Sequence, residues 1–420
     1  MLVLLIYNLL LTLATPFLLF SLYKNKPNKP KFGPRWKEHF GITPKLNSTQ
    51  QPLWIHAVSV GECLAVVPLI KAIKAKRPKE IIVVTTTTTT GAEQIAKLGN
   101  LVEHRYMPID FPFAIRGFLR AIKPKKLLIM ETELWPNTLT ITHKAKVPII
   151  VVNARLSKKS QQNYARIQPF FNLIHPCLSK ILCQSQTDAE HFVKLGVTPQ
   201  KITVIGSIKY DIEISEETKS QSSQLRDKLG KNRPIWIAAS THKGEDEIIL
   251  DAHKKILAFH PNALLIIVPR HPERFNSVFE LCKKEKFNTI RRTNNIKITK
   301  DVQVYLGDTM GEMLVLIGAA DVCFMGGSLL GDKFGGHNVL EPAALGVPII
   351  IGPSYFNFKE ITDNLHKNKV LSIAFNASQI SKLFSHYIKN NKDMKNKTDE
   401  IMRSNKGSIN KTISTAGLME

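Results

Sequence analysis

Cysteine is scarce in this chain, and its five cysteines (Cys63, Cys177, Cys183, Cys282 and Cys323) are scattered over 420 positions with no CxxC pair. Their spacing indicates neither a zinc site nor a disulfide framework, and a reducing cytosol is the expected setting. Glycine-rich phosphate-binding motifs are lacking too. No first strand is followed by GxGxxG, which argues against a dinucleotide dehydrogenase, and the lack of a Walker A motif disfavours an ATPase.

Acidic residues are few compared with basic ones, since 34 Asp and Glu oppose 58 Lys and Arg and the formal net charge is +24. Such a surplus suits nucleic acid, an anionic membrane surface or acidic small substrates. The chain has no basic–aromatic interleaving, zinc-finger pattern or arginine-rich arm, so nucleic acid is not an expected partner. Its length and its 43% of apolar residues predict two or three globular domains.

The long apolar run lies at the N-terminus. Residues 1–23 are almost wholly apolar, and about 20 such residues cross a bilayer core as a helix. No basic segment precedes the run and no small-residue cleavage site follows it, so we expect a retained anchor; a monotopic segment and a cleaved signal are the alternatives. Positive charge follows in a Lys- and Pro-rich linker at 24–34, which predicts a cytoplasmic location for the body of the chain.

From Pro52 onward, short β-rich runs alternate with helical patterns, which predicts parallel sheets covered by helices on both faces. A polar stretch at 213–232 is expected to connect two doubly wound domains at 35–212 and 233–390, with a ligand site in the cleft between them. A polar tail at 391–420 is expected to pack weakly, with a final helix crossing back as the alternative. The predicted strands are 53–58, 81–86, 126–130, 147–152, 181–184 and 202–205, then 235–239, 264–268, 302–306, 322–325, 348–351 and 370–373.

Acidic residues end two strands of the first domain. Glu62 lies between a strand and a helix, and Glu131 ends another buried strand. Open α/β sheets place ligands at the carboxyl ends of their strands. Arg155 and Lys209 end later strands of the same sheet, so the four side chains are expected to converge on one cleft, where they suit proton abstraction from a hydroxyl beside a bound anionic sugar. The alternative for Glu62 is that it only complements a helix N-terminus, where the macrodipole favours acids.

The chain around Glu62 predicts a tight turn at Gly61 and a helix from Cys63 onward. Downstream, the Thr85–Thr90 run predicts a strand end that leads into a hydroxyl-rich helix cap before Gly91. Contact of these exposed hydroxyls with a sugar is the alternative interpretation.

Strand ends in the second domain carry residues suited to a nucleotide. An arginine such as Arg270 binds phosphate through a fork of donors, helix N-termini hold anions, and paired glycines permit close approach of a backbone. Glu341 suits ribose hydroxyls, and the alternative is a capping box with Asn338. The candidate residues are Pro269, Arg270, Met310, Gly311, Glu312, Gly326, Gly327, Ser328, Asn338, Val339, Leu340 and Glu341.

The combination of these motifs closely resembles the Kdo (3-deoxy-D-manno-octulosonic acid) transferases of lipopolysaccharide synthesis, in the family's order from about Arg35 to Phe358. The N-terminal anchor is also typical of that family. The motifs are HAVSVGE, the Thr-rich segment ending TGA, METELWP, NARLS, GSIKYD, PRHPERF, GDTMGE, MGGSL and GGHNVLEPAALGVPIIIGP.

The resemblance implies a GT-B glycosyltransferase at the cytoplasmic face of the inner membrane, which transfers Kdo from CMP-Kdo to the lipid A precursor. By the motif match Glu62 would be the general base of an inverting reaction. Glu131 and Lys209 match positions that support the transition state. CMP would lie on Pro269–Arg270, Met310–Glu312 and Asn338–Glu341, and Arg155 and 326–328 would line the cleft.

The same resemblance implies no metal and no other cofactor, since GT-B enzymes generally need none and the chain shows no DxD motif or histidine cluster. His56, His271 and His337 are interpreted as hydrogen-bonding residues of loops. The working pKa of Glu62 stays open, because a helix N-terminus lowers the pKa of a carboxylate whereas desolvation by a bound lipid raises it.

Three alternatives remain at this point: another GT-B enzyme that uses a UDP-sugar, a nucleotide-sugar epimerase of similar fold, and a non-catalytic, membrane-tethered lipid-binding protein. An epimerase would turn over its nucleotide-sugar without a lipid acceptor. A binding protein has no need of both Glu62 and Glu131.

Overall fold

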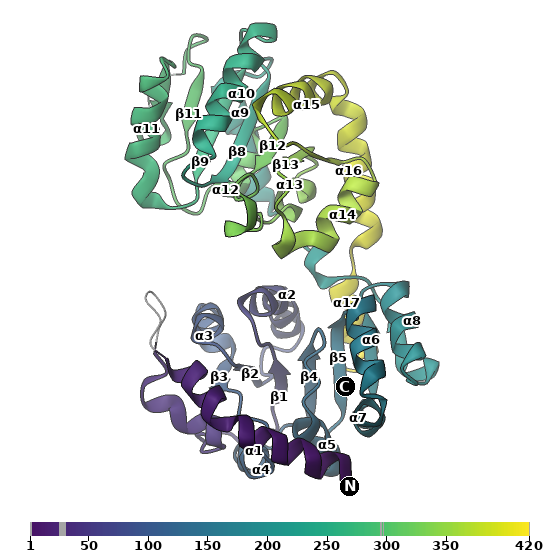
Figure 1. Cartoon of the computed structure of the whole chain (residues 1–420). Helices are drawn as coiled ribbons and strands as arrows, with labels where there is room; N and C mark the ends of the chain where they lie inside the picture. Colours follow the sequence, from purple (N-terminus) through teal and green to yellow (C-terminus); the bar gives the residue numbers. More distant parts are fainter. Residues whose placement is uncertain (1, 25–30, 295, 297, 420) are drawn as a thin grey trace. The chain divides into compact units, whose positions relative to one another are not determined.

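The computed structural model describes residues 2–24, 31–294, 296 and 298–419. It divides into two compact units: unit 1 comprises Met1–Asp211 with Asn405–Glu420, and unit 2 comprises Ile212–Ser404 (Figure 1). Each unit is built on one seven-stranded parallel sheet, so the predicted α/β architecture is confirmed. All five cysteines are buried and free. Most of the predicted 24–34 linker lies outside the described residues.

Unit 1 winds its chain outward from the middle of its sheet in both directions, in the strand order β3-β2-β1-β4-β5-β6-β7. The topology therefore reverses between β1 and β4. Its strands are β1 (Leu53–His56), β2 (Ile82–Thr86), β3 (Glu103–Tyr106), β4 (Lys126–Met130), β5 (Ile149–Ala154), β6 (Lys180–Cys183) and β7 (Ile202–Val204). Its helices are α1 (Leu2–Tyr23), α2 (Val60–Lys76), α3 (Thr89–Ala96), α4 (Pro112–Ile122), α5 (Pro136–Lys144), α6 (Lys158–Arg166), α7 (Gln168–Ile174), α8 (Gln186–Lys194) and α17 (Ser408–Thr415).

Two hydrophobic cores hold the unit 1 helices to the sheet. One core joins the sheet to α2, α3 and α17, and the other joins its opposite face to α4, α5, α7 and α8. Because both faces are covered, the central strands carry near-continuous apolar runs, which is why their positions could be predicted.

Unit 2 repeats the same plan, in the order β10-β11-β9-β8-β12-β13-β14, with the reversal between β8 and β12. Its strands are β8 (Ile235–Thr241), β9 (Leu264–Pro269), β10 (Thr289–Arg291), β11 (Val304–Leu306), β12 (Val322–Met325), β13 (Ile349–Ile351) and β14 (Leu371–Ile373). Its helices are α9 (Glu216–Gly230), α10 (Asp246–Phe259), α11 (Phe275–Lys284), α12 (Met313–Gly318), α13 (Leu340–Ala344), α14 (Lys359–Lys367), α15 (Ala377–Lys389) and α16 (Asn391–Asn405).

Two edge strands, β3 and β10, were not predicted. Their sequences are Glu-His-Arg-Tyr and Thr-Ile-Arg, and each pairs with a neighbour on one side of its sheet. An edge strand is only partly covered, so it tolerates polar side chains and lacks the apolar run by which the buried strands are recognised.

The expected connection at 213–232 and the expected tail at 391–420 are largely helical. The connection forms α9, which packs against α12 within unit 2. The tail continues as α16 and then as α17, which returns to unit 1 and packs on α2. Asp211 accepts backbone N–H groups from Gly407 and Ile409, both at 2.6 Å. The prediction that the tail packs weakly is therefore wrong for α17. The alternative prediction, a final helix that crosses back, describes α17 correctly.

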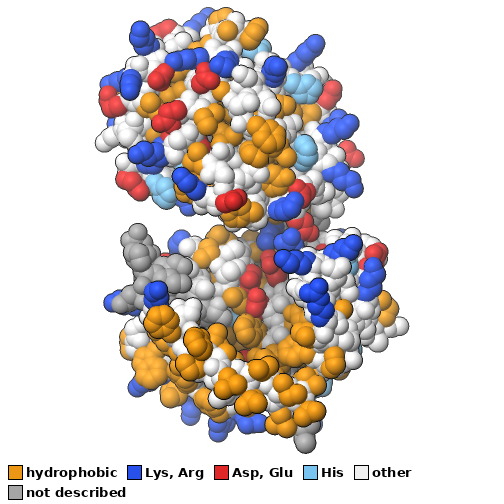
Figure 2. Space-filling model, in the orientation of Figure 1, with side chains coloured by type: hydrophobic (Ala, Val, Ile, Leu, Met, Phe, Trp, Pro, Cys, Tyr) orange, Lys and Arg blue, Asp and Glu red, His pale blue; other side chains and the backbone are white. Residues whose placement is uncertain are grey.

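Helix α1 is long and apolar enough to cross a membrane, with a mean hydropathy of 2.2 over its most apolar stretch, and is compatible with a membrane anchor. Polar groups tie one side of it to unit 1. The hydroxyl of Tyr7 donates to Asp110 Oδ2 (2.9 Å), and Asn137 Nδ2 donates to Asn8 Oδ1 (2.6 Å). Leu11 is buried, whereas many of the other large side chains of α1 are exposed, as in Phe17 at 77%, and Figure 2 shows hydrophobic side chains gathered over α1.

We expect Ile413→Ala in α17 to destabilise unit 1. Ile413 is 1% exposed in the core that α17 shares with α2, and such a truncation leaves a cavity that costs about 2–5 kcal/mol. Denaturant unfolding measures the loss, and the exposed neighbour Lys411→Ala is the matched control. Equal stability of both variants would show that α17 does not belong to the unit 1 core.

Candidate functional site

Glu62 and Glu131 lie together at the reversal point of the unit 1 sheet. Glu62 is in the first turn of α2, which follows β1, and Glu131 directly follows β4, the neighbour of β1. Open α/β sheets bind ligands where the topology reverses, at the carboxyl ends of the strands. The structure thus brings these two predicted residues to the edge where chemistry is expected.

The loop before α2 positions the carboxylate of Glu62. Helix α2 begins at Val60, so Gly61 lies within its first turn rather than in the tight turn that was predicted. Ser59 caps the helix by accepting the N–H of Glu62 (3.3 Å), and its hydroxyl donates to Glu62 Oε1 (3.1 Å). The backbone N–H of Val58 donates to Glu62 Oε2 (2.5 Å). Glu62 is thus held in a variant of the capping box, and its capping role does not exclude a chemical one.

Burial raises the pKa of Glu62 from its ordinary value of 4.5 to about 7. The N–H of Val58 and the hydroxyl of Ser59 lower this pKa, whereas the charges of Glu131 and Glu133 raise it. The rise in pKa caused by burial is therefore larger than the decrease caused by the donors at the helix N-terminus, even without a bound ligand. A carboxylate with a pKa near 7 suits general base catalysis, because it is substantially ionised at neutral pH and still takes up a proton readily.

Glu131 is paired with the basic residue predicted to lie beside it. Lys209 Nζ donates to Glu131 Oε1 at 2.9 Å, and both side chains keep about a quarter of their surface exposed (29% and 26%). The backbone of Glu131 has φ of 55°, in the left-handed region that disfavours residues other than glycine. Such a conformation persists where the surrounding structure holds it, and here the N–H of Glu131 donates to the carbonyl oxygen of Val152 at 3.0 Å.

Asn153 positions Lys209 and had no role in the sequence prediction. It is fully buried at the end of β5, with φ of 53°, and its Oδ1 accepts the N–H of Ile208 (3.2 Å). This bond holds the turn that carries Lys209. The remaining predicted residue of the sheet, Arg155, follows β5 and is exposed. The sequence signal for Asn153 was its place in NARLS, directly after an apolar strand.

In unit 2 a buried glutamate organises the corresponding edge, and sequence reasoning missed it. Glu245 has no exposed surface and accepts the N–H of His242 (3.0 Å), in the loop after β8. It also accepts N–H groups from the loop after β12, at Gly327 (2.7 Å), Ser328 (2.8 Å) and Leu329 (3.0 Å). The signal for this role was a glutamate four residues after a buried strand.

Packing explains the paired glycines beside Glu245. A Cβ on Gly326 would lie 2.4 Å from the carbonyl oxygen of Ser240, and Gly327 has φ of 70°. The side chain of Ser328 is fully buried, donates to Met325 O (2.7 Å) and accepts the N–H of Gly352 (2.8 Å). The side chain of Ser328 therefore does not line a cleft, contrary to the prediction.

Histidines lie at the same edge of unit 2. Nε2 of His242 and Nε2 of His337 are hydrogen-bonded at 2.9 Å, and the ring of His242 stacks on Phe334 with centroids 3.7 Å apart. Burial lowers the pKa of His337 to about 4, so this ring is neutral at pH 7. Its predicted role as a hydrogen-bonding residue fits this geometry. Among the residues that the structure describes, no three His, Cys, Asp or Glu side chains are grouped to hold a metal.

Arg270 lies within electrostatic reach of this histidine pair and of Glu341. Arg270 is exposed after β9, where its N–H donates to Thr241 O (3.0 Å). Burial raises the pKa of Glu341, and the charge of Arg270 opposes that rise, which places the guanidinium within electrostatic reach of the carboxyl. Asn338 Nδ2 donates to Glu341 Oε1 (3.2 Å), and Asn338 Oδ1 accepts the N–H of Leu340 (3.1 Å). The two form a turn before α13 rather than the capping box named as an alternative.

Several other residues predicted to bind the nucleotide already have partners within unit 2 or are buried there. Glu312 accepts two hydrogen bonds from Arg292, at 2.7 and 2.6 Å, so its carboxylate is already paired. Helix α12 has six residues, begins at Met313 and follows the exposed Met310 and the turn at Gly311, which has φ of 82°. The predicted residues Val339 and Leu340 have buried side chains, and Pro269 ends the buried strand β9. At Val339, Leu340 and Pro269, therefore, only backbone groups remain to contact a ligand.

Comparisons with known proteins agree with this architecture. Residues 34–212 match a family model described as 3-deoxy-D-manno-octulosonic-acid transferase (kdotransferase), and residues 221–405 match the model of glycosyl transferases group 1. A 3-deoxy-D-manno-octulosonic acid transferase of Haemophilus influenzae is 41% identical over 84% of this chain and 83% of its own. A probable mitochondrial 3-deoxy-D-manno-octulosonic acid transferase of Arabidopsis thaliana is 32% identical over 81% of this chain and 77% of its own.

Among solved structures, the UDP-GlcNAc 2-epimerase of Neisseria meningitidis bound to UDP-GlcNAc superimposes with a TM-score of 0.57. It is 13% identical and covers 88% of this chain and all of its own, so it shows the fold alone. Together with the two parallel sheets and the glycosyltransferase family models, this similarity confirms the predicted GT-B fold.

We expect the carboxyl of Glu62 to titrate near pH 7 and Glu131→Gln to lower that pKa, because the Glu131 charge raises it. Carboxyl-carbon NMR titration measures both values, with Glu62→Gln to assign the signal. Glu103→Gln, at an exposed acid of unit 1, is the control that leaves the titration unchanged. Titration of wild-type Glu62 near 4.5 would contradict the burial argument.

We expect Glu245→Ala to destabilise unit 2, since it leaves backbone N–H groups of two loops without their acceptor. Each unsatisfied buried group costs about 1–3 kcal/mol. Thermal unfolding measures the effect, and Glu247→Ala, at an exposed position of the same helix, is the control. An unchanged Tm for Glu245→Ala would show that the two loops do not depend on this carboxylate.

Proposed function

The chain belongs to the 3-deoxy-D-manno-octulosonic acid transferase family, and we propose that it transfers Kdo from CMP-Kdo to the lipid A precursor lipid IVA, with inversion at the anomeric carbon. The observation that carries this proposal is the carboxylate of Glu62, buried at the reversal point of the unit 1 sheet with its pKa raised to about 7. A glycosyltransferase acceptor is a hydroxyl, which must lose its proton as its oxygen attacks.

In the proposed mechanism, Glu62 takes the proton of the acceptor hydroxyl while that oxygen forms a bond to the anomeric carbon of Kdo. The bond from the anomeric carbon to the phosphate oxygen breaks, and CMP leaves with the electron pair. Lys209, held by Glu131 at 2.9 Å, supplies a positive charge for the carboxylate and phosphate of the donor in the transition state. The proton count balances, because Glu62 gains the proton that the acceptor loses.

We place CMP at the edge of unit 2, where the loops after β8, β9 and β12 meet. Arg270 would bind the phosphate, and Glu341 the ribose hydroxyls. The backbone of Gly326 and Gly327, kept in place by Glu245, permits close approach of the nucleotide. In this proposal no metal takes part, because Arg270 supplies the positive charge that the leaving phosphate requires.

We further propose that α1 anchors the protein at the inner membrane, with the two units on the cytoplasmic face. The exposed apolar side chains of α1 support an anchor, and the net charge of +24 favours an anionic surface and anionic reactants.

We expect Glu62→Gln to lower kcat for transfer by about 10²–10⁴-fold, the usual contribution of a general base, and to leave the affinity for CMP-Kdo unchanged. The amide still accepts the N–H of Val58, so the fold is retained. Mass spectrometry of the lipid product measures transfer, and Glu103→Gln is the control. Wild-type transfer by Glu62→Gln would refute the base, whereas CMP release by the wild type without acceptor would favour an epimerase-like reaction.

A further inference from the structure

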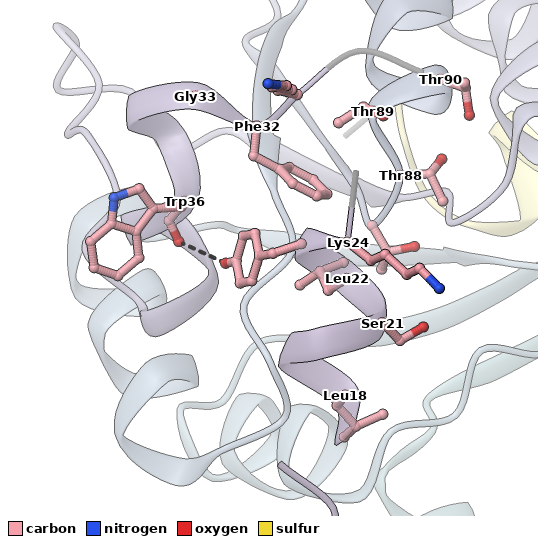
Figure 3. A pocket seen from close by; sticks show the side chains of 13 residues that line it. Leu18, Ser21, Leu22, Lys24, Phe32, Gly33, Trp36, Thr88, Thr89 and Thr90 are labelled. Carbon is pink, nitrogen blue, oxygen red and sulfur yellow. Dashed lines mark hydrogen bonds between the residues drawn. The ribbon is translucent and has the colours of Figure 1, made fainter. Parts of the chain in front are cut away.

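A cavity of about 710 Å³ lies in unit 1, between the end of α1, the 3-10 helix η1 (Gly33–Phe40) and the start of α3. Its volume falls within the range of about 300–1,000 Å³ that is usual for ligand pockets. Figure 3 shows the side chains of these three segments around the same space. All the described residues that line the cavity belong to unit 1.

The cavity lining has an apolar part and a hydroxyl-bearing part. Leu18 and Leu22 of α1 and Phe32 and Trp36 at η1 form the apolar part. The consecutive residues Thr87–Thr90, at the end of β2 and the start of α3, form the hydroxyl-bearing part. Such a lining suits an amphipathic molecule, with hydrocarbon on one side and a hydroxylated group on the other.

The charge of the cavity is of one sign. Lys24 and Lys31 belong to its lining, and no acidic side chain is found among the described residues that line it. Two ammonium groups without a neighbouring carboxylate in the cavity attract an anionic group such as a phosphate. The ligand is therefore expected to be anionic as well as amphipathic.

The hydroxyl-bearing part of the cavity touches the segment that holds Glu62. The hydroxyls of Thr87 and Thr88 each donate to the carbonyl oxygen of Val58 at 3.4 Å. The N–H of the same Val58 donates to Glu62 Oε2 at 2.5 Å. A sugar bound against these threonines thus lies beside the residue that positions the proposed base.

The apolar part of the cavity continues onto the exposed surface of α1. Phe17 and Phe20, which are next to the lining residues Leu18 and Ser21 in α1, are 77% and 69% exposed. A helix with such side chains favours the hydrocarbon side of a membrane interface. Acyl chains that lie along α1 would therefore meet the apolar part of the cavity.

We propose that this cavity is the docking site of the acceptor, a phosphorylated glycolipid. Its phosphate binds Lys24 and Lys31, the base of its acyl chains packs on Leu22 and Trp36, and its sugar lies along Thr87–Thr90 toward Glu62. This assignment rests on the proposed function and goes beyond it, because it names the side chains that select the acceptor.

The first test is kinetic and uses the full-length protein in mixed micelles. We expect Lys24→Glu/Lys31→Glu to raise KM for the phosphorylated acceptor at least tenfold, with KM for CMP-Kdo unchanged and kcat within about threefold. The control is Lys45→Glu/Lys97→Glu, which changes the net charge equally at exposed lysines outside the cavity. With a dephosphorylated acceptor, the difference between the two double variants should disappear.

Trp36→Ala tests the apolar part independently. It should raise KM for the acylated acceptor at least fivefold and leave KM for a deacylated, water-soluble acceptor unchanged, because only the former has chains to pack on the ring. Equal effects on both acceptors, or lysine variants that match their control, would overturn the docking site while wild-type transfer still upheld the proposed function.

Photo-crosslinking supplies a readout that does not depend on transfer. A benzophenone amino acid at Thr90, in nanodiscs of phosphatidylglycerol and phosphatidylcholine, should label added acceptor in preference to phospholipid. Labelling of phosphatidylglycerol that the acceptor does not displace would assign the cavity to membrane phospholipid and overturn the proposal, as would no lipid labelling. Acceptor labelling by the benzophenone-bearing protein, together with no transfer by the wild-type protein, would instead refute the proposed function alone.

Discussion

Each sheet has a glutamate near its reversal point that accepts hydrogen bonds from the backbone. The two glutamates differ in the number of these donors, and this number separates a structural carboxylate from a titratable one. Glu245 in unit 2 is saturated with N–H groups from two loops, so its carboxylate serves as a fixed structural acceptor. Glu62 in unit 1 receives one backbone N–H and one hydroxyl while it is nearly buried. Because these donors compensate only part of the desolvation, its pKa rises to about 7.

Charges at the strand ends of unit 1 add to the effect of this incomplete compensation on Glu62. The negative charges near Glu62 raise its pKa further, and one of them, on Glu131, is kept in place by Lys209. Asn153 fixes the turn that carries this lysine through a buried hydrogen bond to Ile208. The left-handed backbone of Glu131 and Asn153 is tolerated because the neighbouring strands β4 and β5 hold both residues.

Sequence patterns predicted most of the fold, and the exceptions have a common cause. Buried strands were found because both faces of a parallel sheet require apolar residues, whereas β3 and β10 lie at edges and carry polar side chains. Helix α17 was placed in a weakly packed tail because its polar flanks hide the two isoleucines, Ile409 and Ile413, that join the core with α2. Its partner is more than 300 residues away, so no local pattern marks the contact.

For the site, the sequence alone determined which residues stand at strand ends and hence which acids and bases share a sheet edge. Glu62, Glu131 and Lys209 follow from that rule, because the carboxyl ends of parallel strands lie on one side of their sheet. Only the tertiary structure decided which side chains remain available for a ligand. It pairs Glu312 with Arg292 and buries Ser328 against Gly352, and each of these partners lies 20 or more residues away in the sequence. It also set the pKa of the candidate base, because burial is a property of the packed fold.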